Sequence, residues 1–104
     1  MYRVKLTPAA YRMFNSLHST VKKQLKSILK ELYENPYLGK ELRDELINFR
    51  SLKMKRYRAI YQIDNRNKEA IIYAIGHRRD IYEIVTFSEK KSKIHRSSVS
   101  KTVR

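Results

Sequence analysis

Residues 49–77 carry the pattern that most restricts the fold of this chain. Three segments, 49–54, 56–63 and 69–77, alternate aromatic or branched residues with basic or polar ones. A repeat of two residues is typical of β-strands whose two faces differ in burial. The sequence Asp-Asn-Arg-Asn-Lys at 64–68 has the composition of a hairpin turn. The stretch therefore predicts three consecutive antiparallel strands.

The residues before this stretch predict one strand and two helices. Residues 2–6 alternate apolar with basic side chains, which is the pattern of a strand. Thr7–Pro8 combines a preferred N-cap with a first-turn proline and predicts a helix over 8–17. Ser19–Thr20 predicts the cap of a second helix, whose apolar stripe ends before Asn35–Pro36. The order predicts an α+β fold, β-α-α-β-β-β, in which a helix hairpin packs on one face of an antiparallel sheet.

A chain of 104 residues has room for one compact domain. We expect that domain to span residues 1–87, with a loop over 36–48 that holds a helical turn near 42–46. Residues 88–104 contain little that a core can bury. We therefore expect them to form a basic and flexible C-terminal tail.

The charge of the chain points to a polyanionic or an acidic partner. The formal net charge is +14, which favours such partners over a neutral small molecule. The sequence has no cysteine, no clustered metal ligands and no glycine-rich phosphate loop, so we expect neither a metal nor another cofactor. No apolar run approaches the roughly 20 residues that span a bilayer, and the first residues do not resemble a secretory signal. We expect a cytoplasmic protein without membrane contact.

Positive charge converges where the predicted hairpin closes. Antiparallel pairing across the 64–68 turn brings the start of one strand, with Arg58, beside the end of the next, with Arg78. The short connection near residue 55 brings Lys53 alongside. We expect a phosphate-binding site at this end of the sheet, to which further cations are added by Lys53, Lys55, Arg56 and Arg79. Within the strand predicted over 56–63, alternate side chains are expected to face opposite sides. One set should pack in the core (Tyr57, Ala59, Tyr61, Ile63) and the other should face solvent (Arg56, Arg58, Gln62).

Such a site can cleave RNA without a metal. The 2′-hydroxyl attacks the adjacent phosphate, and the step needs a base, an acid and positive charge near the phosphorane. Arg58 and Arg78 are candidates for that charge, because a guanidinium pairs with two phosphate oxygens at once. His77 and Tyr82 are candidates for proton exchange. A histidine at the end of a strand also fits a purely structural role.

Two segments, Tyr57–Ile63 and Ala74–Tyr82, resemble the closing signatures of the RelE/ParE toxin superfamily. The resemblance extends over residues 2 to about 84. It implies the compact, microbial-ribonuclease-like RelE fold and the toxin half of a type II toxin-antitoxin pair, neutralised by a cognate antitoxin. RelE-like members are mRNA interferases, endoribonucleases that cut messenger RNA on the ribosome and contact 16S rRNA. By position, the resemblance assigns catalytic roles to Arg58, Arg78 and Tyr82.

The second strand departs from the RelE pattern. RelE-like toxins carry two lysines there for acid-base work, and an ungapped alignment puts Phe49 and Ser51 at those positions. Lys53 or Lys55 can take their place after a small shift, or His77 can, as in YoeB-like relatives. The identities of the base and the acid stay open. ParE-like members have the same signatures and inhibit DNA gyrase without cutting RNA, which is the main alternative. A passive RNA-binding module is a third.

Overall fold

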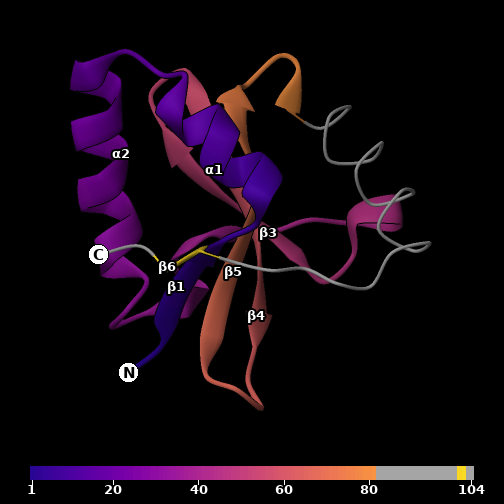
Figure 1. Cartoon of the computed structure of the whole chain (residues 1–104). Helices are drawn as coiled ribbons and strands as arrows, with labels where there is room; N and C mark the ends of the chain where they lie inside the picture. The colour runs from indigo at the N-terminus through magenta and orange to yellow at the C-terminus, as the bar shows by residue number, and fades with distance from the viewer. Residues whose placement is uncertain (82–100, 103–104) are drawn as a thin grey trace.

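Two helices lie against one sheet in the computed structural model, which describes residues 1–81 and 101–102 (Figure 1). The sheet has six strands in these residues, in the order β2-β3-β4-β5-β1-β6. The α+β prediction and the predicted order of elements are confirmed. The elements are β1 (Arg3–Leu6), α1 (Pro8–Asn15), α2 (Ser19–Glu31), η1 (Pro36–Leu38), β2 (Lys40–Glu41), η2 (Asp44–Leu46), β3 (Phe49–Met54), β4 (Tyr57–Asp64), β5 (Glu69–His77) and β6 (Lys101–Thr102).

The C-terminal part of the chain is largely outside this description. The predicted tail over 88–104 and the domain boundary at residue 87 lie outside the described residues, except for β6. That strand pairs with β1, where Lys5 lies opposite Thr102. In the part of the chain that the structure describes, no helix is long and apolar enough to cross a membrane.

Strands β3, β4 and β5 form the predicted antiparallel meander. The register of β4 and β5 shifts between Ile60 and Tyr61, because Ile60 pairs with Ala74 whereas Tyr61 pairs with Ile72. Tyr73 is therefore the extra residue of a β-bulge. Strand β1 adds to the other side of β5 in parallel, which requires the long connection that the two helices provide.

The two helices begin at different kinds of cap. The Thr7 hydroxyl accepts a hydrogen bond from the Ala10 N–H at 3.1 Å, as predicted for α1. The cap predicted for α2 is wrong, because Ser19 and Thr20 already lie inside the helix. His18 caps it instead, and its Nδ1 accepts from the Thr20 N–H at 3.2 Å. An imidazole nitrogen satisfies a free helical N–H in the same way as a hydroxyl oxygen.

Both faces of the sheet carry a hydrophobic cluster. The larger cluster joins α1 and α2 to the sheet and buries Leu25 and Tyr61 completely. The smaller one lies on the opposite face and includes Ile60, which is also completely buried. The side chains predicted to face solvent are exposed at Arg56 and half-buried at Arg58 and Gln62, but the same face is covered in the middle of β4, at Ile60. Residues near η2 fold back over that face, which strand periodicity does not reveal. The smaller cluster comprises Leu46, Phe49, Ile60, Ala74 and Ile81.

A buried tyrosine fastens the segment before β2 to the sheet. The Gly39 N–H donates to the Tyr61 hydroxyl oxygen at 2.8 Å, and that hydroxyl donates to the Pro36 carbonyl at 2.6 Å. The segment then forms β2, in which Lys40 pairs with Ser51 of β3. The predicted loop over 36–48 thus contains a short strand that the sequence analysis missed. The helical turn expected near 42–46 is present as η2.

Stability at alkaline pH is expected to depend on Tyr61. Burial raises the pKa of its phenol above the ordinary value of 10.0, although the Gly39 hydrogen bond and the Arg50 charge oppose the rise. A pKa that is higher in the folded chain gives stability that is present below pH 10 and is lost as the pH rises through the folded pKa. The difference in unfolding free energy between wild type and Tyr61→Phe should therefore stay constant up to about pH 10 and shrink as the pH rises further. Urea denaturation measures it, and a constant difference would contradict the prediction.

Candidate nucleic-acid interface

The register of the meander places Lys53 and Arg58 side by side. Lys53 of β3 lies opposite Arg58 of β4, and Arg58 in turn lies opposite Gly76 of β5. Residues directly opposite each other in a sheet point to the same face. The prediction that the two short connections bring these segments together is confirmed.

Arg78 continues the same row. It follows β5, and its N–H donates to the Arg56 carbonyl at 2.7 Å, so the pairing extends one step beyond the strand. Alternation along the strand then places Arg78 on the same face as Arg58. The remaining cations of the predicted site, Lys55, Arg56 and Arg79, are exposed in the two turns beside it. We refer to Lys53, Arg58 and Arg78 as the cation row.

No carboxylate neutralises the cation row within the described residues. The ion pairs found there are those of Glu69 with Arg3 and Lys5, and of Glu41 with Arg50. Among residues 1–81 and 101–102, the hydrogen bond found for the Arg58 guanidinium goes to the carbonyl of its neighbour Tyr57, at 3.4 Å. Like charges gathered on one strand end without counter-charges create a field that attracts phosphate.

His77 lies on the other face of the sheet. It pairs with Tyr57, and the two rings meet edge to face with centroids 6.0 Å apart. Its Nδ1 accepts a hydrogen bond from the Arg79 N–H at 3.2 Å. The neutral ring therefore carries its proton on Nε2. The structure brings Lys53, Arg58 and Arg78 to one face but does not bring His77 to it.

The positions that the ungapped alignment assigned to lysines are occupied by side chains of the sheet interior. Phe49 and Ser51 share the face of Lys53, and both are buried. Lys53 itself occupies the place opposite Arg58. Lys40 pairs with Ser51 and adds another cation to this face, which the sequence analysis missed. The two-residue strand β2 is too short to produce a periodic signal.

Tyr82, the remaining predicted catalytic residue, lies outside the described residues. Asp80 is the acidic residue nearest to Arg78 in the sequence. Its side chain is exposed, and its backbone N–H donates to the His77 carbonyl at 3.1 Å. In the residues that the structure describes, no three His, Asp or Glu side chains gather at one place. The chemistry available on this face is therefore anion binding and stabilisation of negative charge by fixed cations.

The sequence and the fold both match known toxins. Residues 4–82 match the family described as ParE toxin of type II toxin-antitoxin system, parDE. The chain is 33% identical over 86 residues to toxin RelG of Mycobacterium tuberculosis, in an alignment that covers 78% of this chain and 95% of RelG.

Two solved structures have the same fold. The RelBE2 toxin-antitoxin complex from Mycobacterium tuberculosis matches with a TM-score of 0.70 and 29% identity, and the match covers 74% of this chain and 98% of that chain. The isolated E. coli RelE toxin matches with a TM-score of 0.67 and 25% identity, covering 90% and 99%. Together with the family match over most of the sequence, these likenesses establish that the chain is a type II toxin of the RelE/ParE family.

Proposed function

We propose that this toxin is a metal-independent endoribonuclease that cuts messenger RNA on the ribosome. The observation that supports the proposal most strongly is the cation row, in which Lys53, Arg58 and Arg78 share one face of the sheet without a carboxylate among the described residues. In the cleavage step a general base takes the proton of the 2′-hydroxyl and the 2′-oxygen bonds to the neighbouring phosphorus. The phosphorane that forms carries extra negative charge, and the bond from phosphorus to the 5′-oxygen then breaks. Fixed guanidinium groups stabilise that charge more than they stabilise the ground state.

Lys53 is the residue we assign to the lysine role of RelE-like toxins. Its Cα lies directly opposite that of Arg58, and its side chain is exposed. The two-residue turn at Lys55–Arg56, with Lys55 at a φ of 53°, sets this register. An ammonium group at this place can donate a proton to the leaving 5′-oxygen. His77, on the other face, supports the strand end in this scheme.

The partner that restrains the toxin is expected to be a cognate antitoxin. The Mycobacterium tuberculosis RelBE2 structure is a toxin-antitoxin complex, and the match covers 98% of the chain aligned in it. The net charge of +14 favours an acidic antitoxin segment.

Cleavage can be tested in a translation extract programmed with a defined message. The toxin should cut the message in frame with the ribosome, and Arg78→Ala should abolish the cuts, because the arginine no longer stabilises the phosphorane. Primer extension maps the cut sites. A message that stays intact while ribosomes translate it at high toxin concentration would exclude the nuclease.

The second candidate is inhibition of DNA gyrase, which is favoured by the match of residues 4–82 to the ParE description. It predicts an intact message together with gyrase-dependent breaks in supercoiled DNA. A gyrase cleavage assay with the same toxin preparation separates the two functions.

A further inference from the structure

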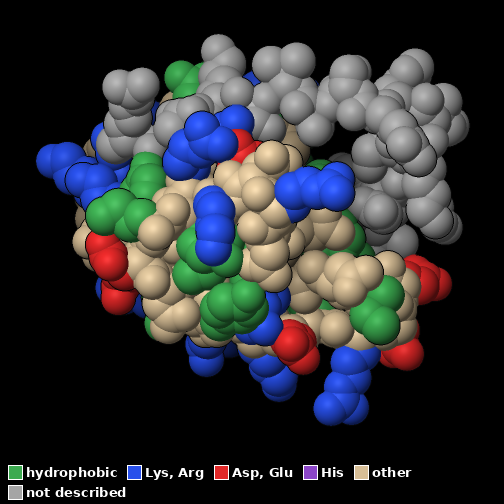
Figure 2. Space-filling model, turned by 90° about the horizontal axis from the view of Figure 1, so that it is seen from below, with side chains coloured by type: hydrophobic (Ala, Val, Ile, Leu, Met, Phe, Trp, Pro, Cys, Tyr) green, Lys and Arg blue, Asp and Glu red, His purple; other side chains and the backbone are tan. Residues whose placement is uncertain are grey.

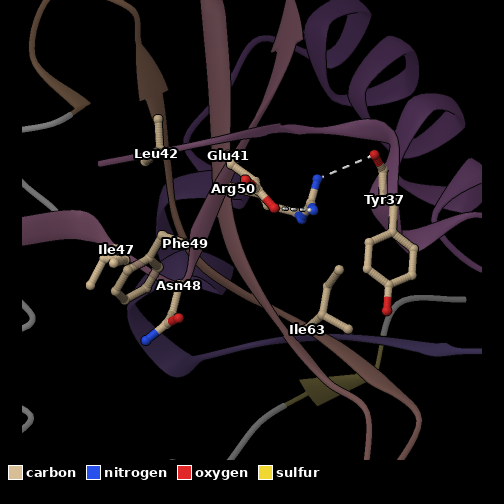
Figure 3. Close-up of a pocket in the computed structure, with 8 residues that line it drawn as sticks. All are labelled: Tyr37, Glu41, Leu42, Ile47, Asn48, Phe49, Arg50 and Ile63. Atoms are coloured by element: carbon tan, nitrogen blue, oxygen red, sulfur yellow. Dashed lines mark hydrogen bonds and ion pairs between the residues drawn. The ribbon is translucent and has the colours of Figure 1, made fainter. Parts of the chain in front are cut away.

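A pocket lies at the opposite end of β3 from the cation row. Its volume is about 250 Å³, and Tyr37, Phe49 and Ile63 contribute apolar walls (Figure 3). Phe49 and Lys53 are four residues apart on one strand, which separates them by about 13 Å at roughly 3.3 Å per residue. The pocket is therefore a separate place from the cation row. It lies where β3 begins and borders both faces of the sheet, because Phe49 shares the face of Lys53 whereas Arg50 and Ile63 belong to the face that the helices cover.

The ring of Tyr37 is held rigidly although half of the side chain is exposed. Its hydroxyl donates to the Asn65 side-chain oxygen at 3.1 Å, and the Tyr2 hydroxyl donates to the same oxygen at 2.6 Å. The Arg50 guanidinium lies 5.0 Å from the centre of the Tyr37 ring. A ring that is fixed before binding loses little conformational entropy when another ring stacks on it.

Arg50 is itself fixed in place. Its guanidinium donates to the Gly39 carbonyl at 2.6 Å and to the Glu41 carboxylate at 3.0 Å. It therefore holds the position beside Tyr37 that Figure 3 shows, between the aromatic wall and β2. A cation on an aromatic wall strengthens stacking with an electron-rich ring.

The rim of the pocket offers polar groups to a bound ring. Asn48 borders the pocket with an exposed side-chain amide, which has both donors and an acceptor. Its backbone has a φ of 78°, a left-handed conformation that asparagine tolerates better than most residues. The Glu41 carboxylate, 78% exposed, adds acceptor oxygens. Aromatic walls with a polar rim suit a flat ring that has hydrogen-bonding edges.

The two charged residues of the pocket lining, Arg50 and Glu41, pair with each other, so the cations beyond the lining are what favours a nucleic acid as the source of that ring. Figure 2, which views the end of the molecule that carries the β4–β5 turn, shows Lys and Arg side chains lying among hydrophobic ones, with Asp and Glu side chains also on this face. In the β4–β5 turn, the Lys68 ammonium lies 5.4 Å from the centre of the Tyr2 ring. Aromatic rings interleaved with cations are the usual surface for unpaired nucleotides.

We propose that the Tyr37 pocket binds one unpaired nucleobase of the RNA. This base lies a few nucleotides along the RNA from the phosphate that the cation row binds. Tyr37 stacks on the base, and the Asn48 amide contacts its edge. The inference deepens the proposed function and rests on it for the identity of the nucleic acid. The pocket would give the toxin affinity for the message beyond what charge alone provides.

The test is RNA binding without cleavage. A fluorescein-labelled single-stranded RNA with 2′-O-methyl groups throughout cannot be cut by 2′-hydroxyl attack, and fluorescence anisotropy reports its affinity. Removing one base at a time should weaken binding to the wild type about tenfold at one position. Tyr37→Ala should weaken binding of the complete RNA by a similar factor and should no longer respond to the missing base.

Two variants control for indirect effects. Tyr37→Phe keeps the ring but loses the hydrogen bond from the hydroxyl to Asn65, so its affinity for RNA should fall between those of the wild type and Tyr37→Ala. Leu38→Ala removes a neighbouring exposed apolar side chain that does not line the pocket, and it should leave the affinity unchanged. Urea denaturation confirms that each variant is folded.

The inference is overturned if Tyr37→Ala binds the RNA like the wild type, or if a missing base has the same effect on both proteins. It is also overturned if Tyr37→Ala weakens only the antitoxin complex, since the pocket then belongs to the antitoxin interface. Its failure is distinct from failure of the nuclease proposal. If the wild type cleaves the message and Tyr37→Ala binds RNA normally, only the pocket proposal fails. If RNA binding depends on one base through Tyr37 and the wild type does not cleave the message, only the nuclease proposal fails.

Discussion

Replacing Arg58 with alanine is expected to slow cleavage of ribosome-bound message about 100- to 1,000-fold, which is the usual effect of removing one preorganised donor to a developing oxyanion. Arg58 is half-buried, and its guanidinium has no carboxylate partner among the described residues, so its charge is available to phosphate. Single-turnover cleavage on stalled ribosomes measures the rate of the chemical step.

Two further variants show whether the loss of cleavage rate comes from the charge and geometry of Arg58. Arg58→Lys keeps the charge but loses the two-pronged geometry, so it should retain part of the activity and fall between the wild type and Arg58→Ala. Arg12→Ala removes an exposed arginine from α1 and should cleave like the wild type. If Arg58→Ala and Arg12→Ala have the same rate, Arg58 has no role in the chemistry.

Replacing Gly39 with alanine is expected to lower the free energy of unfolding by about 2 kcal/mol. A Cβ at this position would lie 2.6 Å from the Tyr61 hydroxyl oxygen and 2.7 Å from a ring carbon of Tyr61. Tyr61 cannot retreat, because it is completely buried and bonded to Pro36. The melting temperature should fall by roughly 10 °C. Urea and thermal denaturation measure both quantities.

The chain offers a matched glycine control. A Cβ at Gly76 would meet only the end of the Ile81 side chain, at 3.3 Å, so Gly76→Ala should cost clearly less stability. Combining Gly39→Ala with Tyr61→Leu should also cost less than the sum of the single changes, since the shorter side chain removes the clash. Equal losses for the two glycine variants would contradict the explanation.

Local rules accounted for much of the fold. The alternation over 49–77 and the turn at 64–68 predicted the meander, and strands β3 and β5 have the predicted limits. Contacts that depend on distant segments were not predictable in this way. The parallel pairing of β1 with β5, the strand β2 and the cover over Ile60 all arise from packing between parts of the chain that carry no mutual signal.

The sequence alone determined that cations meet where β3, β4 and β5 end, because a tight turn forces neighbouring strands to return to the same place. Only the tertiary structure decided which side chains of different strands share a face. If β4 and β5 paired from Asp64–Glu69 onward without a bulge, His77 would lie opposite Arg56 and on the same face as Arg58. The extra residue, Tyr73, shifts the register by one, so His77 lies opposite Tyr57 and Arg78 pairs with Arg56, on the side of Arg58. Side chains alternate along a strand, so a single inserted residue exchanges the two faces.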